Sequence, residues 1–255
     1  MSASVAVKNI VIGAGRPKIC IPLMDPDPVS LSQTVSRLKE IPFDLVEWRA
    51  DALENLLSPD VRLEALTLLR RLLPQTPILF TLRTAAEGGS ANVNPEEYEE
   101  ILMDAIRSGL PDLIDIELSC GEEMMKRLLS AVHEHSMFAV GSRHNFKATP
   151  SKEEIVHTLR IMQELGCDLA KYAVMPQCER DVLTLLDATL TMKEHFPGTP
   201  VITMSMGPLG AVSRISGELF GSALTFGTAG TASAPGQLPA RTLSTFLRQL
   251  SVDAG

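Results

Sequence analysis

A lysine inside an apolar segment is the strongest chemical signal in this sequence. Lys171 interrupts the run Asp168-Leu-Ala-Lys-Tyr-Ala-Val-Met175, which is otherwise typical of a buried strand. Burying an ammonium group costs several kcal/mol unless the charge is paired. One interpretation is a structural ion pair with Glu47 or Glu117, and the other is a nucleophilic amine. A lysine of ordinary pKa, about 10.4, is neutral in only about one molecule in 2,500 at pH 7, so a nucleophile needs burial or neighbouring cations.

A histidine and a glutamate offer acid–base chemistry beside this lysine. His144 lies in Gly141-Ser-Arg-His-Asn-Phe-Lys147, just beyond a predicted strand. Imidazole titrates near neutrality, so it can remove a proton and later return one to a leaving hydroxyl. Glu87 can orient the ring and stabilise the imidazolium. His133 and His135 are two positions apart on a predicted helix and point in different directions, so we expect no metal site.

The elements that must position these residues alternate along the chain. Each apolar, β-branched segment is followed by a stretch of helical periodicity. The predicted strands are Lys18–Met24, Leu45–Arg49, Ile78–Arg83, Leu113–Leu118, Phe138–Ser142, Leu169–Val174, Val201–Met206 and Ala223–Phe226. Eight strand–helix units at a spacing of roughly 30 residues are typical of a (β/α)₈ TIM barrel. No linker interrupts the pattern, so we predict one domain over residues 1–255.

An open, doubly wound sheet is the competing fold. It usually binds a nucleotide at a glycine-rich turn between its first strand and a helix. The segment Val11-Ile-Gly-Ala-Gly15 begins like such a turn, but Arg16-Pro17 and another strand follow it. We therefore expect a hairpin turn there. Residues Val5–Ile12 are predicted to form a short hairpin that closes the N-terminal end of the barrel.

All strands of such a barrel end at one face, and enzymes with this fold hold their active sites there. We therefore expect the polar residues that carry chemistry near the ends of the strands. Ionisable and polar residues do gather near the ends of the predicted strands. They are Glu47, Arg49, Arg83, Glu87, Glu117, Arg143, His144, Arg214 and Gln237. So many at one end are hard to explain as packing, and they indicate an active site.

A loop of small residues follows the last predicted strand. Thr225-Phe-Gly-Thr-Ala-Gly-Thr-Ala-Ser-Ala-Pro-Gly-Gln237 suits a mobile lid, a phosphate cradle or a plain connector. We favour the lid, since lids need small hinge residues and Ser233 and Gln237 supply hydrogen-bonding groups. A phosphate site is the second choice.

Composition limits the remaining possibilities. The formal net charge is −8 and no basic run is present, which argues against a nucleic-acid partner. No apolar run reaches the length of about 18 residues that spans a membrane. The four cysteines are scattered too widely to predict a disulfide framework or a zinc site. We expect a reduced, cytoplasmic protein.

The residues above resemble the type I 3-dehydroquinate dehydratase family from about Asn9 to Leu250. Seven blocks carry the resemblance in order. They are Glu47-Trp-Arg-Ala-Asp51, Phe80-Thr-Leu-Arg-Thr-Ala-Ala-Glu-Gly-Gly89, His144-Asn-Phe146, Lys171 with Met175-Pro-Gln177, Thr203-Met-Ser-Met206, Ser213-Arg214 and Ser233-Ala-Pro-Gly-Gln237.

The resemblance implies a cofactor-free (β/α)₈ hydro-lyase, commonly a homodimer, that acts on 3-dehydroquinate in the shikimate pathway. It implies that Lys171 forms a Schiff base with the substrate ketone, that His144 is the base and that Glu87 pairs with it. It further implies that Arg214 binds the substrate carboxylate. The same resemblance gives Glu47, Arg49 and Arg83 as further substrate contacts, and Ser233 and Gln237 as lid residues.

Two residues depart from the family's pattern. Pro22 stands where a serine is common, which puts one substrate contact in doubt, and Asn145 stands where an aspartate is common after the histidine. Two other functions stay open from the residues themselves. One is a Schiff-base aldolase that handles sugar phosphates, and the other is a catalytically silent barrel that binds a ligand.

Overall fold

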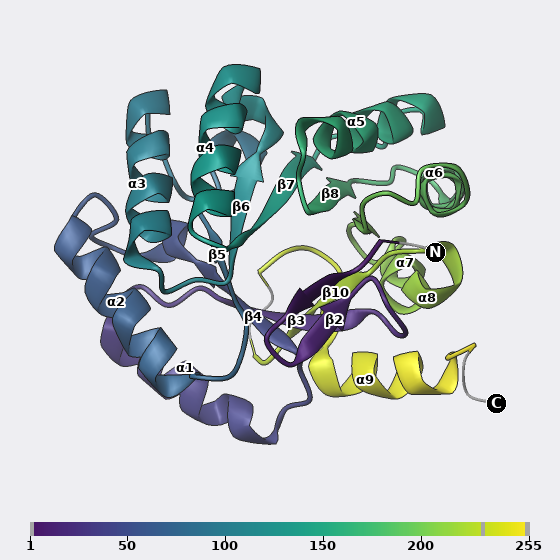
Figure 1. The fold of residues 1–255 in the computed structure, drawn as a ribbon. Helices are drawn as coiled ribbons and strands as arrows, with labels where there is room; N and C mark the ends of the chain where they lie inside the picture. The colour runs from purple at the N-terminus through teal and green to yellow at the C-terminus, as the bar shows by residue number, and fades with distance from the viewer. Residues whose placement is uncertain (1–2, 231–232, 253–255) are drawn as a thin grey trace.

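Eight parallel strands curl around a central axis in chain order, with helices on the outside (Figure 1). The computed structural model describes residues 3–230 and 233–252. The strands are β3 (Lys18–Leu23), β4 (Leu45–Arg49), β5 (Ile78–Thr81), β6 (Leu113–Glu117), β7 (Phe138–Asn145), β8 (Leu169–Val174), β9 (Val201–Ser205) and β10 (Leu224–Thr228), with a two-residue strand β11 (Leu238–Pro239) beside β10. The predicted (β/α)₈ barrel is confirmed.

Helices follow the strands along the chain. They are α1 (Pro28–Arg37), α2 (Pro59–Leu72), α3 (Pro95–Ser108), α4 (Glu122–Glu134), α5 (Lys152–Leu165), α6 (Glu179–His195), α7 (Ala211–Ile215), α8 (Gly217–Phe220) and α9 (Ala240–Gln249), with short 3₁₀ turns at Leu38–Glu40, Ala50–Ala52, Ala85–Glu87 and Leu118–Cys120. Asn94 caps α3 and Ser151 caps α5, each in a capping box with the glutamate three residues on. Replacing such a cap by alanine costs about 1 kcal/mol.

Alternation along each strand separates the barrel interior from the layer under the helices. In β4, Leu45 belongs to the interior apolar cluster, whereas Trp48 packs in the outer cluster, edge-on against Phe80 with ring centroids 5.5 Å apart. In β8, Leu169 and Ala173 likewise lie in the interior cluster. The residue between them, Lys171, therefore shares the interior face.

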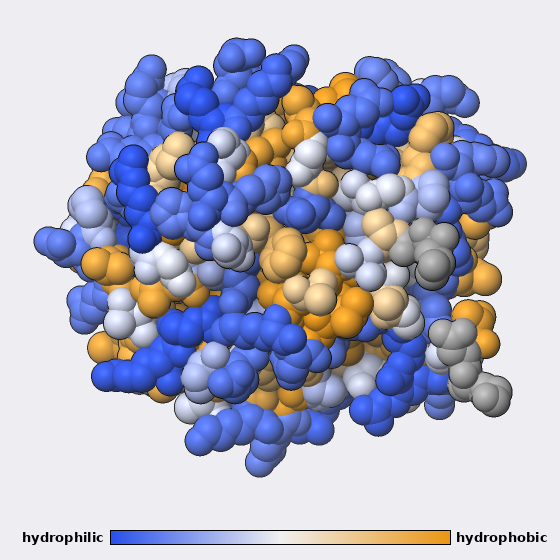
Figure 2. All heavy atoms as spheres, in the orientation of Figure 1, coloured by the Kyte–Doolittle hydropathy of each residue, from blue (hydrophilic) through white to orange (hydrophobic). Residues whose placement is uncertain are grey.

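A short antiparallel hairpin closes the N-terminal end of the barrel, as predicted. Its strands are β1 (Val5–Val7) and β2 (Ile10–Ile12), and its turn lies at Lys8, whose φ is 51°. The hairpin packs into the interior apolar cluster, with Ile12 fully buried. The expected turn at 11–15 is wrong in detail, because Gly13 and Gly15 lie after β2, in its connection to β3. In a space-filling view, hydrophilic side chains cover the peripheral helices and apolar ones gather near the centre, around the hairpin (Figure 2).

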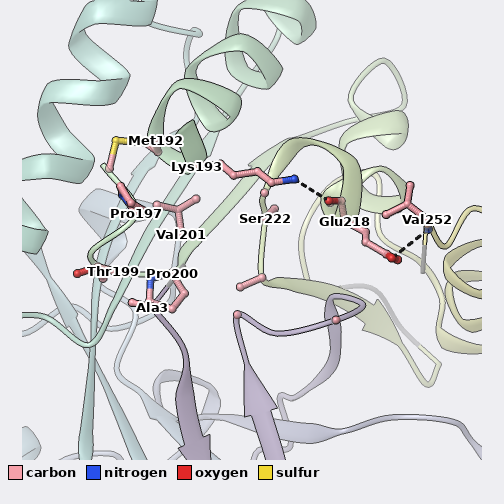
Figure 3. A pocket seen from close by; sticks show the side chains of 15 residues that line it. Ala3, Met192, Lys193, Pro197, Thr199, Pro200, Val201, Glu218, Ser222 and Val252 are labelled. Carbon is pink, nitrogen blue, oxygen red and sulfur yellow. Dashed lines mark hydrogen bonds between the residues drawn. The ribbon is translucent and has the colours of Figure 1, made fainter. Parts of the chain in front are cut away.

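The seam between β9 and β10 is the weakest junction of the barrel. One bridge joins them, between Val201 and Ser222, and the amide of Ala223 donates to the Val201 carbonyl over 2.8 Å. Ser222 Oγ also accepts from the amide of Thr203 over 3.0 Å, so a side chain replaces part of the missing ladder. A cavity of about 240 Å³ lies beside the seam (Figure 3). Its one lysine, Lys193, already donates to the carbonyls of residues 218 and 219.

Candidate active site

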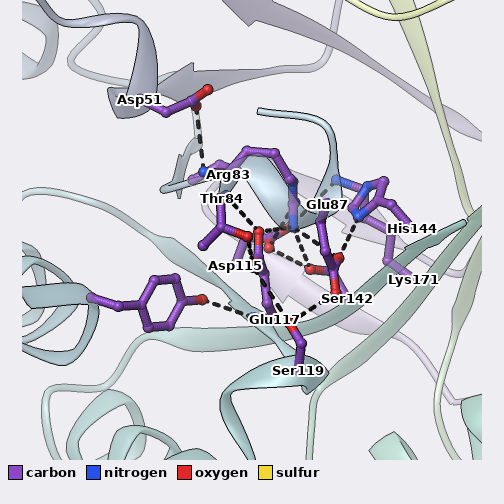
Figure 4. A network of polar contacts seen from close by, with 12 residues as sticks. Asp51, Arg83, Thr84, Glu87, Asp115, Glu117, Ser119, Ser142, His144 and Lys171 are labelled. Carbon is purple, nitrogen blue, oxygen red and sulfur yellow. Dashed lines mark hydrogen bonds and ion pairs between the residues drawn. The ribbon is translucent and has the colours of Figure 1, made fainter. Parts of the chain in front are cut away.

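Charged side chains from several strands converge at the carboxyl ends of the barrel (Figure 4). The cavity there is lined by Glu47, Arg49, Arg83, Glu87, Gly88, His144, Phe146, Lys171, Ala173, Met204, Met206, Arg214, Phe226, Ser233, Ala234 and Gln237. All nine residues that the sequence singled out for catalysis or substrate binding are among them. The barrel therefore gathers residues from positions 47 to 237 around one cavity.

Lys171 lies at the centre of this cavity, with 3% of its surface exposed. Its Nζ is 3.4 Å from Glu47 Oε1 and 3.3 Å from Asp115 Oδ2, and it stands 4.6 Å from the centre of the Phe226 ring. The expected pairing with Glu47 is confirmed. The alternative pairing with Glu117 is wrong, because that carboxylate binds Arg83.

Arg83 connects three carboxylates, two on β6 and one in the turn after β5. It lies two residues beyond the end of β5 and is 3% exposed. Its guanidinium is 2.8 Å from Asp115, 2.9 Å from Glu117 and 3.6 Å from Glu87. Burial works against the charge, but these carboxylates outweigh it and raise the pKa of Arg83 above its ordinary value. Arg83 is thus a fixed cation that orders the floor of the site.

Asp115 is a site residue that our sequence reasoning did not single out. It is 1% exposed and accepts a 2.5 Å hydrogen bond from Ser142 Oγ, besides its contacts with Lys171 and Arg83. Burial opposes its charge, yet the two cations and the Ser142 bond hold the pKa of Asp115 below its ordinary value. The signal was present in Leu113-Ile-Asp-Ile-Glu117, where two acids at period two share the interior face of a strand.

His144 and Glu87 form a close pair at the mouth of the cavity. His144 Nδ1 lies 2.9 Å from Glu87 Oε2. The other oxygen, Glu87 Oε1, accepts from Ser119 Oγ over 3.0 Å. His144 does not follow the strand, as we expected, but lies inside β7, which continues to Asn145. A strand position holds the imidazole more firmly than a loop would.

The surroundings of this pair favour the neutral form of each partner. Burial, together with the nearby charges of Arg83, Lys171 and Arg49, lowers the pKa of His144 well below its ordinary value. Burial and the neighbouring Glu117 carboxylate raise the pKa of Glu87 to about 7. The imidazole is therefore neutral near pH 7 and has a lone pair available as a base.

Arg49 is held by an acid two residues away. Its Nε and Nη2 donate to the two oxygens of Asp51 over 2.7 and 2.8 Å. Asp51 also accepts from the amide of Ser90 over 3.0 Å, in the loop that carries Glu87. The fork of Arg49 is thus oriented by a carboxylate that also ties down the neighbouring loop.

Arg214 is buried without a carboxylate partner among the described residues. It lies on α7, is 2% exposed, and donates from Nη2 to the carbonyl of Pro235 over 3.0 Å. No described residue accepts from its Nε. Burial lowers the pKa of Arg214 to about 10. A guanidinium in such a place is suited to an anion supplied from outside the protein.

The predicted lid residues hold each other across a tight turn. Gln237 Oε1 accepts from the Ser233 amide over 2.9 Å, and Gln237 Nε2 donates to Ser233 Oγ over 2.8 Å. The carbonyl of Pro235 accepts from the Gly207 amide over 3.1 Å, and Gly236, at φ 76°, packs against the Gly207 backbone. Positions 231 and 232 of the predicted lid lie outside the described residues.

The two departures from the family's pattern have different structural settings. Asn145 Oδ1 accepts from the amides of Lys147 and Ala148, both over 3.0 Å, so its amide turns the chain after β7. Pro22 lies in β3 opposite Glu47 and is not among the described residues that line the cavity.

Fold and site together define a parallel α/β-barrel enzyme whose cavity holds a buried lysine and a histidine–glutamate pair. The family described as Type I 3-dehydroquinase matches residues 19–254. The 3-dehydroquinate dehydratases of Bacillus licheniformis and Escherichia coli are each 45% identical to the chain, over 98% and 96% of its length and 98% and 97% of theirs. The chain belongs to the type I 3-dehydroquinase family, a family of hydro-lyases.

Solved structures agree with this membership. A crystal structure of type I 3-dehydroquinate dehydratase from Clostridium difficile with covalently modified comenic acid matches with a TM-score of 0.95 and 44% identity, covering 98% of both chains. The 3-dehydroquinate dehydratase of Geobacillus kaustophilus matches with a TM-score of 0.93 and 37% identity, covering 100% of both chains. No helix in the described part of the chain is long and apolar enough to cross a membrane. Within those residues, no cluster of potential metal ligands is found.

Proposed function

We propose that the protein removes water from 3-dehydroquinate to give 3-dehydroshikimate, through a Schiff base on Lys171. The observation that carries the proposal is the placement of three groups around one cavity. A buried lysine, a histidine–glutamate pair and an arginine with no carboxylate partner among the described residues face it from β8, β7, the loop after β5 and α7. These groups match a nucleophile, a base and a carboxylate anchor, and the relatives that cover nearly the whole chain carry the name of this enzyme.

The reaction begins with a bond between Lys171 Nζ and the C3 ketone carbon. The neutral amine adds to the carbonyl, and loss of the resulting hydroxyl as water leaves a positively charged iminium. This cation draws electrons from the adjacent C2–H bond and acidifies it. The carboxylates of Glu47 and Asp115, within 3.4 Å of Nζ, are placed to balance its positive charge.

Elimination requires a base that can become an acid. A proton on Nδ1 satisfies the bond of His144 to Glu87 and leaves the Nε2 lone pair free to take the C2 proton. The enamine that forms expels the C1 hydroxyl, which leaves as water with the proton from His144. Hydrolysis of the imine consumes one water and restores Lys171. The net change is therefore the loss of one water from the substrate.

The remaining residues bind and enclose the substrate. Arg214 offers its guanidinium fork to the substrate carboxylate. Glu47, Arg49 and Arg83 contact the substrate hydroxyls, and Ser233 and Gln237 close the site above it. We propose that the enzyme needs no cofactor, that it is one catalytic domain over residues 1–255, and that it serves the shikimate pathway in the cytoplasm.

We also propose a homodimer. Leu209, Val212 and Phe246, near and on the packed helices α7 and α9, are 46%, 45% and 39% exposed and offer an apolar surface for a second copy. Light scattering should then give twice the chain mass of 27.6 kDa. A mass of one chain at micromolar concentration would refute the dimer without touching the chemistry.

The catalytic proposal is tested by mixing the protein with 3-dehydroquinate and following the ultraviolet absorbance of the conjugated product. A parallel sample receives borohydride, and the adduct is located by intact-mass and peptide analysis. We expect product and a reduced adduct on Lys171. The substitution Lys171→Met should abolish both, whereas Lys126→Met, on the surface of α4, should leave both in place.

Each other outcome has a definite meaning. Turnover without an adduct on Lys171 would remove the Schiff base from the proposal. Adduct formation with sugar phosphates but not with 3-dehydroquinate would favour an aldolase, and binding of 3-dehydroquinate without turnover would favour a silent binding protein.

A further inference from the structure

Glu87 and His144 come from different parts of the fold, so their contact depends on how these parts are held against each other. Glu87 ends the 3₁₀ turn after β5, and His144 lies in β7, with β6 between these strands. Their 2.9 Å contact therefore depends on where the turn rests against β7. The turn's own bonds, such as Gly89 N to Thr84 O over 2.8 Å, fix its shape but not its position over His144.

The ring of Phe146 lies against the backbone of Gly88, the residue after Glu87, and beside the ring of His144. A methyl group added at Gly88, the residue after Glu87, would lie 2.3 Å from Phe146 Cε2 and 2.5 Å from Cζ. The phenyl ring thus rests directly on the Gly88 backbone, where φ is 82°. The same ring lies 23° from parallel with the His144 imidazole, with ring centroids 6.4 Å apart.

Packing of the apolar core does not account for this position. Phe146 is 37% exposed and lines the catalytic cavity rather than the core. It follows Asn145, whose side chain accepts from the amides of Lys147 and Ala148 and so turns the chain directly after β7. A large apolar ring is therefore held at the mouth of the site, against Gly88, which has no side chain.

We propose that Phe146 is a positioning residue that clamps the Glu87 turn against His144 through its contact with Gly88. The inference rests on the proposed dehydratase function. The charged groups that face His144 are Glu87 on the turn, Arg83 beyond β5, Lys171 on β8 and Arg49 on β4. Removing the ring admits water to the pair and loosens it, while leaving those charges in place.

The test is a double-mutant cycle on kcat between Gly88→Ala and Phe146→Ala. Each single change should lower kcat about 10-fold, since acid–base catalysis supplies about 10²- to 10⁴-fold and a misplaced pair loses part of it. Gly88→Ala brings the same left-handed backbone strain to the wild-type and the Phe146→Ala backgrounds. Its added methyl group meets the Phe146 ring only in the wild-type background. In the Phe146→Ala background it should therefore cost less than about 3-fold.

A pH profile separates positioning from general loss of structure. Water around His144 weakens the burial that lowers its pKa, so the acidic limb of kcat/KM should move to higher pH in Phe146→Ala. Phe146→Tyr keeps the ring and should return the limb to its wild-type position. Equal costs of Gly88→Ala in both backgrounds, or an unmoved limb in Phe146→Ala, would overturn the clamp. Absence of turnover in the wild-type protein would instead overturn the proposed function.

Discussion

The carboxylate of Asp115 lies between two cations, with one oxygen 3.3 Å from Lys171 Nζ and the other 2.8 Å from Arg83 Nη2. This shared acid links the nucleophile to the arginine that orders the other carboxylates. All three groups are buried, so little water reaches either cation to replace the acid if it is lost. The arrangement makes Asp115 as much a structural residue as a partner of the site.

Asp115→Asn should therefore destabilise the protein strongly. Removing one partner of a buried ion pair costs about 3–5 kcal/mol, because it leaves uncompensated charge in the interior. Urea unfolding at pH 7 measures the loss. Asp187→Asn is the matched control, since Asp187 pairs with Lys152 on the surface over 2.9 Å, and such pairs contribute about 0–1 kcal/mol. Equal losses in the two variants would contradict this account of Asp115.

Arg214→Met should show the opposite effect on stability. Arg214 is a buried cation without a carboxylate partner in the described chain, so a methionine of similar shape removes a desolvation cost. We expect the free energy of unfolding to rise by about 1–3 kcal/mol. Turnover should fall about 100-fold or more in kcat/KM, mainly through KM, as the carboxylate anchor is lost. Arg248→Met on α9 serves as the control, and a fall in stability of Arg214→Met would count against an uncompensated charge.

Glu87→Gln should lower activity but raise the free energy of unfolding at high pH. Burial raises the pKa of Glu87 from 4.5 to about 7, so the folded state binds this proton more tightly than the unfolded chain does. The stability from that proton is present below pH 4.5 and is lost as pH rises to about 7. The side-chain amide of the Glu87→Gln variant does not titrate, so it loses no stability as pH rises, and its oxygen can still accept from His144. We expect a gain of about 1–2 kcal/mol at pH 8 that disappears near pH 4.5, measured by denaturant unfolding at both. A gain of the same size at both pH values would contradict the titration.

Ser222→Ala should loosen the barrel at one place. Ser222 Oγ bridges β9 and β10 through the amide and carbonyl of Thr203, over 3.0 and 3.2 Å. Losing a buried bridge of this kind costs about 1–3 kcal/mol, because the Thr203 amide is left without a partner. Hydrogen exchange should accelerate at the Thr203 amide more than at amides of β6. Uniform acceleration throughout the barrel would mean that the seam opens only with global unfolding.

The positions of strands and site residues were largely predictable from the sequence, whereas their pairings were not. Apolar runs located β4, β6 and β8, and polar residues such as Arg49 and Glu117 marked the strand ends that carry chemistry. Predicting that Lys171 meets Asp115 requires the register of three neighbouring strands. On the ladder, Glu117 is level with Ser142 and Lys171, yet Asp115 is the acid that reaches the lysine. Because the strands of a barrel are tilted, residues paired on the ladder lie at different heights along the barrel axis. Local sequence patterns do not encode this difference in height.

The two hydrogen bonds to the Pro235 carbonyl have a consequence for inhibitors. The Pro235 carbonyl accepts from both Gly207 and Arg214, so the loop above the site is fastened to the residue proposed to hold the substrate carboxylate. A ligand that binds Arg214 without displacing the Pro235 carbonyl leaves both hydrogen bonds intact, so the loop stays closed over the ligand. Such a compound gains residence time from a slow exit, even where its contacts give it modest affinity. Compounds of this kind are better ranked by dissociation rate than by equilibrium potency.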